Sequence, residues 1–334
     1  MIPRLNFANL PTPVEPLTRI SAALGGPRIW VKRDDLTGPV LGGNKTRKLE
    51  FVLAEAQELG AKSIITTGAI QSNHCRQTAG LAARVGLKCA LVVTGKNPEK
   101  AEGNLLLDHL LGAEIVWCSK AEQEKTMKQT FHRFLEAGER PYLIPLGASN
   151  PTGAFGYAAA MDELLAQNVM DPDWIIVASS SAGTQAGLVL GARRNNWNGR
   201  ILGISIDEPL HILQQSVARI ATEASDRLGK AVDFHPEEIN VNASYLGEGY
   251  AVMGAPEAEA IHLFARLEGL LLDPVYTGRA AAGLIDLIRK GFFKKSDNVL
   301  FWHTGGTPAL FADPYSSQLQ NEFKYSTVCK LKNR

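Results

Sequence analysis

Apolar residues recur at helical spacing directly after a double glycine at residues 42–43. They lie three or four positions apart, at Leu49, Val52, Leu53, Ala56 and Leu59. Residues at this spacing share one face of a helix, and a glycine such as Gly60 is typical of a helix end. The pattern predicts an amphipathic helix that ends before Gly60 and has Asn44 as its N-cap.

Beyond this helix, short β-branched runs alternate with helical stretches. The predicted strands cover residues 63–67, 90–93, 114–118, 142–146, 174–178, 201–206 and 299–303. The predicted helices begin near residue 74 and then cover 101–111, 120–137, 153–167, 182–194, 210–228, 256–267 and 279–290. Such alternation is typical of parallel sheets covered on both faces, with right-handed crossovers and binding sites at the carboxyl ends of the strands.

Two loops, at residues 36–44 and 147–152, are the predicted domain boundaries. They flank about a hundred residues of self-sufficient strand–helix units, which is the size of a common domain. The segment 230–255 has the least regular pattern and contains several Gly, Asn, Glu and Tyr residues. We expect it to form a long functional loop.

The composition is that of an ordinary globular protein large enough for two domains. Of 334 residues, 45% are hydrophobic and 21% are charged, and the net charge of +1 provides no field for nucleic acid or anionic lipid. No stretch has the length and hydrophobicity of a membrane span or of a secretion signal. The chain contains no C-x-x-C pair, and its cysteines are Cys75, Cys89, Cys118 and Cys329. We expect reduced thiols and a soluble, cytoplasmic protein with neither nucleic-acid nor membrane partners.

Lys45 stands between the double glycine and the predicted helix. A positive charge in the first turn opposes the helix dipole, and Lys48 follows one turn later on the same face. An anion or a covalent partner would offset this repulsion, and a lysine with a lowered pKa is the usual residue that forms a Schiff base with a carbonyl cofactor. Alternatively, Lys45 is a solvated surface lysine. A nucleotide-binding phosphate loop is disfavoured because Asn44 interrupts the required glycine–lysine junction.

A second candidate lies after the predicted strand 174–178, in the small polar stretch 179–187. Its backbone N–H groups, the hydroxyls of Ser181 and Thr184, and the N-terminus of the following helix would together bind a dianion such as a phosphate. The alternative is a tight strand-to-helix turn with serine caps.

Three further stretches place polar groups at element ends. Ser72 and Asn73 would cap a helix or hold a ligand carboxylate. Tyr250 and Tyr276 are packed rings or groups near a reacting atom. Thr304, at the end of the last predicted strand, would pair with a heterocyclic nitrogen or belong to a glycine-rich turn.

In their order, these stretches resemble a known family. The motifs are Lys32-Arg33-Asp34-Asp35, Gly42-Gly43-Asn44-Lys45-x-Arg47-Lys48-Leu49-Glu50, Gln71-Ser72-Asn73-His74, Asp273-Pro274-Val275-Tyr276 and His303-Thr304-Gly305-Gly306. Over nearly its whole length the chain resembles the pyridoxal-phosphate enzymes of the tryptophan-synthase β-subunit fold (fold type II). Within them it is similar to the group containing aminocyclopropane-carboxylate (ACC) deaminase and D-cysteine desulfhydrase.

The resemblance implies an α/β fold of two domains, each an open, mostly parallel, twisted sheet flanked by helices. Residues 1–44 and 152–334 would form the large cofactor-binding domain, and residues 45–151 the small one. Lys45 would form the covalent link to pyridoxal 5'-phosphate. Its phosphate would be held by Lys48 and by the loop Ser181-Ala182-Gly183-Thr184. Relatives with this fold are generally dimers, so a homodimer is expected.

Other site roles are implied in the same way. Asn73 would contact the ring hydroxyl, and Ser72 would bind the carboxylate of an amino-acid substrate or assist proton movement near Cα. Tyr250 and Tyr276 would lie close to the reacting atoms. Thr277 and Thr304 would be the positions that separate members of the group.

In the deaminases, these two positions hold a glutamate and a leucine; here both are threonines. A carboxylate at the pyridine nitrogen keeps the electron sink strong, whereas a neutral hydroxyl gives a weaker sink that suffices for a good leaving group on Cβ. The threonines therefore predict α,β-elimination, with D-cysteine giving pyruvate, sulfide and ammonia. An L-cysteate sulfo-lyase, an ACC deaminase and a non-catalytic binding protein are the alternatives at this point.

Overall fold

Two sheets account for the alternating pattern in the computed structural model, which describes residues 2–229 and 232–321. The larger sheet has six strands in the order β1 (Val14–Pro16), β2 (Arg28–Arg33), β10 (Asn298–His303), β7 (Trp174–Ser179), β8 (Arg200–Ser205) and β9 (Asn240–Asn242). Only the edge strand β1 is antiparallel to its neighbour in this sheet. The predicted fold class, with its parallel sheets, is confirmed.

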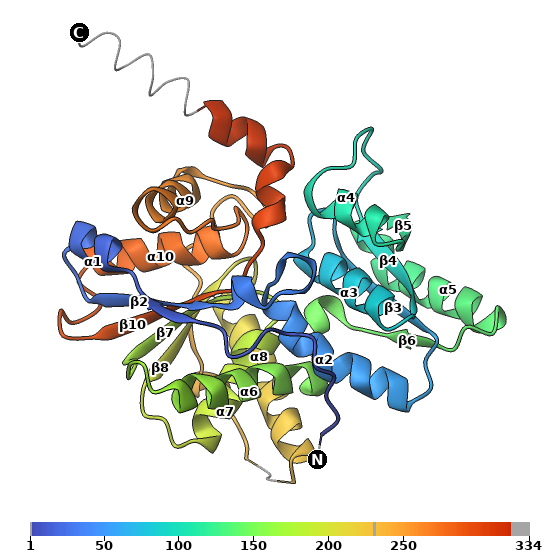
Figure 1. Cartoon of the computed structure of the whole chain (residues 1–334), viewed down its shortest axis with the longest axis horizontal. Helices are drawn as coiled ribbons and strands as arrows, with labels where there is room; N and C mark the ends of the chain where they lie inside the picture. Colours follow the sequence, from blue (N-terminus) through green and yellow to red (C-terminus); the bar gives the residue numbers. More distant parts are fainter. Residues whose placement is uncertain (1, 230–231, 322–334) are drawn as a thin grey trace.

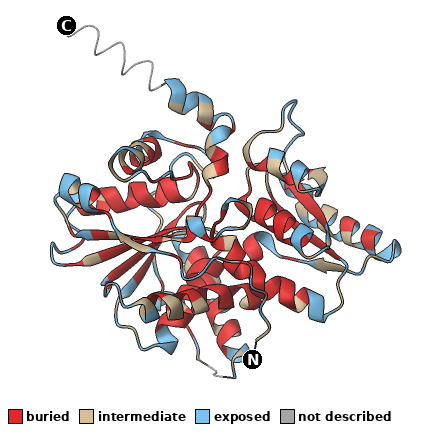
Figure 2. Cartoon of the chain, in the orientation of Figure 1, coloured by how far each residue is buried: buried red, intermediate tan, exposed pale blue. Residues whose placement is uncertain are grey.

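Helices cover both faces of the six-stranded sheet (Figure 1). One face carries α1 (Thr18–Leu24), α9 (Ala255–Glu268) and α10 (Thr277–Arg289), and the other carries α6 (Pro151–Gln167), α7 (Gly183–Arg194) and α8 (Leu210–Arg227). The strands and the inward sides of these helices are buried (Figure 2). We call this sheet with its helices the large lobe.

The smaller sheet is fully parallel, with the order β5 (Glu114–Cys118), β4 (Lys88–Thr94), β3 (Ser63–Ala69) and β6 (Pro141–Leu143). Helix α3 (Asn73–Arg84) packs on one face beside α4 (Gly103–Leu110), and α5 (Gln123–Glu136) packs on the other. We call this sheet with these helices the small lobe. Helix α2 (Asn44–Glu58) lies between the lobes and contacts both α6 and α3 (Figure 1).

The structure differs from the predicted elements in four places. Strands β1 and β2 and helix α1 were not predicted, and the predicted strand at 142–146 ends at residue 143, before a 3-10 turn at Leu146–Ala148. The segment 230–255 contains β9 and the 3-10 turn Pro236–Glu238. Asn44 is the first residue of α2 instead of its N-cap, because its backbone N–H donates to the Thr304 carbonyl and its amide to Thr184 Oγ1.

Buried ion pairs attach α2 to the large lobe. Arg47 donates from Nε and Nη2 to both carboxylate oxygens of Asp34, at 2.9 and 2.8 Å, and from Nη1 to Glu163 at 2.9 Å. Tyr157 and Trp302 donate to Asp34 at 2.6 and 2.8 Å. Burial alone would raise the pKa of Asp34, but the charge and hydrogen bonds of Arg47 lower it. The carboxylate therefore stays ionised and holds the helix in place.

No helix within the described ranges is long and apolar enough to cross a membrane. Cys75, Cys89 and Cys118 are free thiols in buried positions, whereas Cys329 lies outside the described residues.

Replacing Arg47 by Ala should destabilise the protein strongly, because it leaves the buried Asp34 carboxylate without its counter-ion. The expected loss in the free energy of unfolding is about 3–5 kcal/mol, measured by denaturant unfolding. The matched control is Arg289→Ala, which removes an exposed ion pair to Glu259 and should cost less than about 1 kcal/mol. Equal unfolding midpoints for the two variants would contradict this role of Arg47.

Candidate active site

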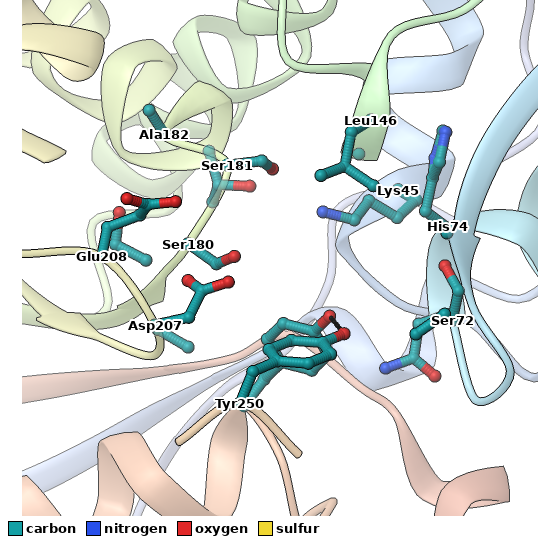
Figure 3. Close-up of a pocket in the computed structure, with 18 of the residues that line it drawn as sticks. Lys45, Ser72, His74, Leu146, Ser180, Ser181, Ala182, Asp207, Glu208 and Tyr250 are labelled. Atoms are coloured by element: carbon teal, nitrogen blue, oxygen red, sulfur yellow. Dashed lines mark hydrogen bonds between the residues drawn. The ribbon is translucent and has the colours of Figure 1, made fainter. Parts of the chain in front are cut away.

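A pocket of about 370 Å³ lies between the lobes, where the carboxyl ends of strands from both sheets meet. Most of the predicted site residues line it: Lys45, Ser72, Asn73, Ser181, Ala182, Thr184, Tyr250, Tyr276 and Thr304. Three others, Lys48, Gly183 and Thr277, are buried and do not line it. Figure 3 shows Lys45 and Ser72 on one side of the pocket and Ser181, Asp207 and Tyr250 opposite them.

Lys45 and Lys48 bring two amines into this region from the first turns of α2. Desolvation lowers the pKa of Lys45 to about 8. Desolvation, and secondarily the charge of Lys45, holds the pKa of Lys48 well below its usual value. In the described part of the chain neither amine has a carboxylate partner, and Lys48 Nζ donates only to Ser149 Oγ, at 2.9 Å. The pair is therefore suited to an anionic ligand.

The loop after β7 lies against Lys48. Ser181 Oγ is 2.8 Å from Ser149 Oγ, the same hydroxyl that Lys48 contacts. Helix α7 begins at Gly183, where a Cβ would come within 2.7 Å of both Lys48 Nζ and Ser149 Oγ. Ala182, with φ of +69°, turns the chain sharply into the helix. The Gly183 N–H donates to the Ser181 carbonyl at 2.9 Å and to Ser149 Oγ at 3.3 Å. The N-terminus of α7, with the positive end of its dipole, thus lies beside the Lys48 amine.

Asn73 and Ser72 begin helix α3 of the small lobe. Ser72 is the N-cap, as one reading of the sequence predicted, and its hydroxyl accepts the Cys75 N–H at 3.2 Å. Asn73 Oδ1 accepts from Arg76 at 3.2 Å and from Asn104 at 2.9 Å. These bonds fix the amide orientation of Asn73 and leave its nitrogen as the free donor.

Tyr250 and Tyr276 form one hydrogen-bonded pair in the pocket. Their hydroxyl oxygens are 2.6 Å apart, and the dashed line in Figure 3 marks this bond. Burial raises the pKa of Tyr250 to about 12 and holds that of Tyr276 well above its usual value. Both phenols are therefore protonated at neutral pH, and the pair can donate a hydrogen bond to a group in the pocket.

A buried arginine holds the loop that carries Tyr250. Arg279 of α10 donates to the carbonyls of Gly249 and Val252 at 3.0 and 2.7 Å, on either side of Tyr250. Its Nε donates to Glu257 at 2.7 Å, which keeps the guanidinium oriented. The irregular segment predicted as a functional loop thus has a fixed conformation at this point.

The two threonines have different surroundings. Thr304 lines the pocket at the end of β10. Thr277 is buried at the start of α10, where its hydroxyl donates to Asp273 Oδ1 and accepts the Asp273 N–H, both at 2.7 Å. The Thr277 hydroxyl is therefore committed to the turn that positions Tyr276.

Comparison with known proteins agrees with the resemblance found in the sequence. The family model described as "Pyridoxal-phosphate dependent enzyme" matches residues 5–305. The chain belongs to this family. A D-cysteine desulfhydrase of Yersinia enterocolitica is 41% identical over 318 residues, covering 93% of this chain and 96% of the relative.

Solved structures of pyridoxal-phosphate enzymes share the fold. A structure described as an ACC deaminase homologue superposes with a TM-score of 0.87 at 36% identity, covering 96% of each chain. A pyridoxal 5'-phosphate-dependent aspartate racemase superposes with a TM-score of 0.62 at 18% identity, covering 88% of this chain and 90% of the racemase, and shows the fold alone. The expected fold type and family are confirmed.

The residues of the pocket fit pyridoxal 5'-phosphate. Its phosphate dianion would supply the counter-charge that Lys48 and Lys45 lack, at the N-terminus of α7 where Gly183 leaves no room for a side chain. Its aldehyde requires a neutral amine, and the lowered pKa of Lys45 leaves a larger fraction of this amine neutral near pH 7 than an ordinary lysine has. A pyridoxal-phosphate enzyme needs both features in one pocket.

His74 also belongs to the pocket and is neutral. Burial, with the charges of Lys45 and Lys48, lowers its pKa well below the usual value. Thr66 Oγ1 donates its proton to the Ile144 carbonyl and so accepts from His74 Nε2, at 2.8 Å. The imidazole therefore carries its proton on Nε2 and adds no charge to the pocket.

Several pocket residues were not predicted from the sequence, among them Lys120, Asp207 and Glu208. Ser149, which accepts a hydrogen bond from Lys48 next to the pocket, was not predicted either. Asp207 and Glu208 follow β8 directly, so the rule that sites lie at the carboxyl ends of strands could have found them. For Ser149 no signal in the sequence pattern was available.

The lowered pKa of Lys45 gives a prediction for cofactor attachment to apoprotein. Below pH 8 the amine is mostly protonated, so the attachment rate should rise about tenfold per pH unit and then level off above about pH 8. Visible absorption after mixing with pyridoxal 5'-phosphate measures this rate. N-acetyl-lysine is the control, since its rate should rise until about pH 10. A protein rate that also rises to pH 10 would show that Lys45 is not desolvated.

Proposed function

We propose that this protein is a D-cysteine desulfhydrase that converts D-cysteine and water into pyruvate, sulfide and ammonia. The observation that carries the proposal is the 41% identity to a D-cysteine desulfhydrase over nearly the full length of both chains. The threonine at position 304 and the absence of a carboxylate at position 277 also support it, because a neutral group suits the elimination of a good leaving group.

Lys45 has two roles in this proposal. Its neutral amine would hold the cofactor aldehyde, and the bound cofactor would supply an electron sink. In its neutral form the same amine would also accept the proton from the substrate Cα. The lowered pKa near 8 supports both roles, since a base must be neutral before it accepts a proton.

The other cofactor contacts follow from the placement of the side chains. Lys48 and the loop Ser181-Ala182-Gly183-Thr184 would hold the phosphate, and the free amide nitrogen of Asn73 would donate to the ring hydroxyl. Thr304 is the proposed partner of the pyridine nitrogen, because Thr304 lines the pocket and the Thr277 hydroxyl is already bonded to Asp273.

The substrate contacts come from both lobes. Ser72 and the first turn of α3 would bind the substrate carboxylate, as hydroxyl and N–H groups at a helix N-terminus commonly do. Tyr250 and Tyr276 would lie beside the β-carbon. When the Cβ–S bond breaks, sulfur keeps the electron pair and leaves as hydrosulfide, to which the phenol pair would donate a hydrogen bond.

The domain division is part of the same proposal, with residues 1–44 and 152–334 as the large cofactor-binding domain and 45–151 as the small one. The four strands of the smaller sheet all fall within 45–151, which supports it. Residues 322–334 lie outside the described residues. We further propose that the protein is cytoplasmic, as its sequence pattern indicates. We also propose a homodimer, on the resemblance to relatives of this fold alone.

The test is sulfide and pyruvate release by purified holoenzyme given D-cysteine or L-cysteine in parallel. Equal amounts of both products from the D-isomer are expected. Lys45→Ala should lose the visible absorption of the bound cofactor and reduce turnover at least about 100-fold. Lys62→Ala, which removes an exposed lysine, is the matched control and should change neither.

Two outcomes would contradict the proposed D-cysteine desulfhydrase activity. Absence of sulfide from both isomers, with pyruvate released from L-cysteate instead, would identify a sulfo-lyase. Ammonia and 2-oxobutyrate from the cyclopropane amino acid would identify a deaminase.

A further inference from the structure

A carboxyl group with an unmet hydrogen bond faces the tyrosine side of the pocket. Asp207 follows β8, and Figure 3 shows its carboxyl group directed into the pocket beside Ser180. Its Oδ1 atom is fully buried and has no hydrogen-bond partner within the described residues. A buried acceptor without a donor is costly, and such atoms are rare in native proteins. Because Asp207 lines the pocket, a molecule bound there lies close to its carboxyl group.

Burial raises the pKa of Asp207, and in its ionised form the carboxyl group has no close counter-ion. Two cations, Lys120 and Arg279, act on it from a distance, but neither forms an ion pair with it in the described structure. Lys120 is exposed, so solvent screens its charge. Arg279 is bound to Glu257 and to backbone carbonyls, including that of Ile206 at 2.8 Å. The side of the pocket that holds Asp207 is thus negative.

The other groups that face Asp207 leave this side of the pocket negatively charged. The Ser180 hydroxyl is neutral, lies beside the carboxyl group and lowers its pKa. The paired phenols of Tyr250 and Tyr276 are protonated, and the Asp207 charge adds to the rise in their pKa. Glu208, the next residue, also lines the pocket and adds a second acidic group. A ligand group held near the tyrosines therefore lies close to hydrogen-bond acceptors and negative charge of the large lobe.

We propose that Asp207 is a specificity-determining residue that restricts the substituent on the substrate β-carbon to groups that donate hydrogen bonds. This inference rests on the proposed function, which puts the β-carbon beside Tyr250 and Tyr276. A thiol, a hydroxyl or an ammonium group can donate to the carboxyl group of Asp207 that lines the pocket. A sulfonate is an anion with acceptors only, so it would be repelled.

Two consequences follow for the substrate class. The sulfonate substrate considered from the sequence is disfavoured. Conversely, an amino acid with a β-ammonium group becomes a candidate second substrate. Its elimination balances in the same way: Cα loses a proton, the Cβ–N bond breaks with the electron pair on nitrogen, and hydrolysis of the remaining enamine gives pyruvate and a second ammonia.

The test uses the holoenzyme and three β-substituted alanines that differ in charge: 2,3-diaminopropionate (cationic), serine (neutral) and cysteate (anionic). Their affinities are measured from the change in cofactor absorption on titration, with D and L forms in parallel. For the wild-type protein, we expect diaminopropionate to bind at least about tenfold more tightly than cysteate in the preferred configuration, because like charges repel in a desolvated site.

Asp207→Asn should reduce this affinity ratio at least about tenfold and leave serine binding nearly unchanged, since the amide is neutral and can still accept a hydrogen bond. The matched control is Asp162→Asn, which changes an exposed aspartate of α6 and should keep the wild-type ratio.

Cysteate binding as tightly as diaminopropionate in the wild-type protein would overturn the proposal, and this comparison needs no variant. An unchanged ratio in Asp207→Asn would overturn it as well. Both readouts are equilibrium titrations, so they are separate from the desulfhydrase assay. Absence of sulfide from D-cysteine would reject the proposed function, while the titrations would still decide the role of Asp207.

Discussion

The attachment of helix α2 to the large lobe is the constraint on which the site depends. Arg47 lies one turn after the double glycine and two positions after Lys45, and its guanidinium bonds to both oxygens of the buried Asp34 carboxylate. Since Asp34 also accepts from Tyr157 and Trp302, the start of α2 is fixed to α6 and β10 together. The position of the Lys45 amine therefore follows from an ionic cluster that has no part in the chemistry.

This attachment places positive charge where the protein itself offers no compensation. Lys45 and Lys48 lie close to the N-terminus of α7, so two amines and a helix dipole of the same sign meet in a desolvated space. The protein tolerates the arrangement by lowering the pKa of both amines. A bound phosphate would supply the negative charge that this region lacks. Desolvation thus lowers the pKa of Lys45, while the excess of positive charge favours binding of the cofactor phosphate.

Sequence reasoning found the parts of the molecule that local patterns encode. The β-branched runs predicted the inner strands, because these are buried on both faces and are apolar throughout. Strand β2 escaped notice since charged residues interrupt its apolar pattern. Lys32 is fully buried there, where its amine pairs with Glu163, far along the chain, at 2.6 Å and also donates to the Thr12 carbonyl and to Gln167. Likewise, Asn44 has the residue type of a cap, but contacts with Thr184 and Thr304 draw it into the helix. Most of the site residues predicted from motifs line the pocket. The direction of the Asp207 side chain, in contrast, could be seen only in the folded chain.

Residues of both lobes line the pocket, and each lobe has its own hydrophobic core. The tyrosine pair, Asp207 and the loop before α7 belong to the large lobe, whereas Ser72 and Asn73 begin a helix of the small one. In the proposed function, the substrate carboxylate contacts the small lobe, whereas the β-substituent faces the large lobe. A change in how the two lobes approach each other would then alter the placement of the substrate without changing the groups that face its β-carbon.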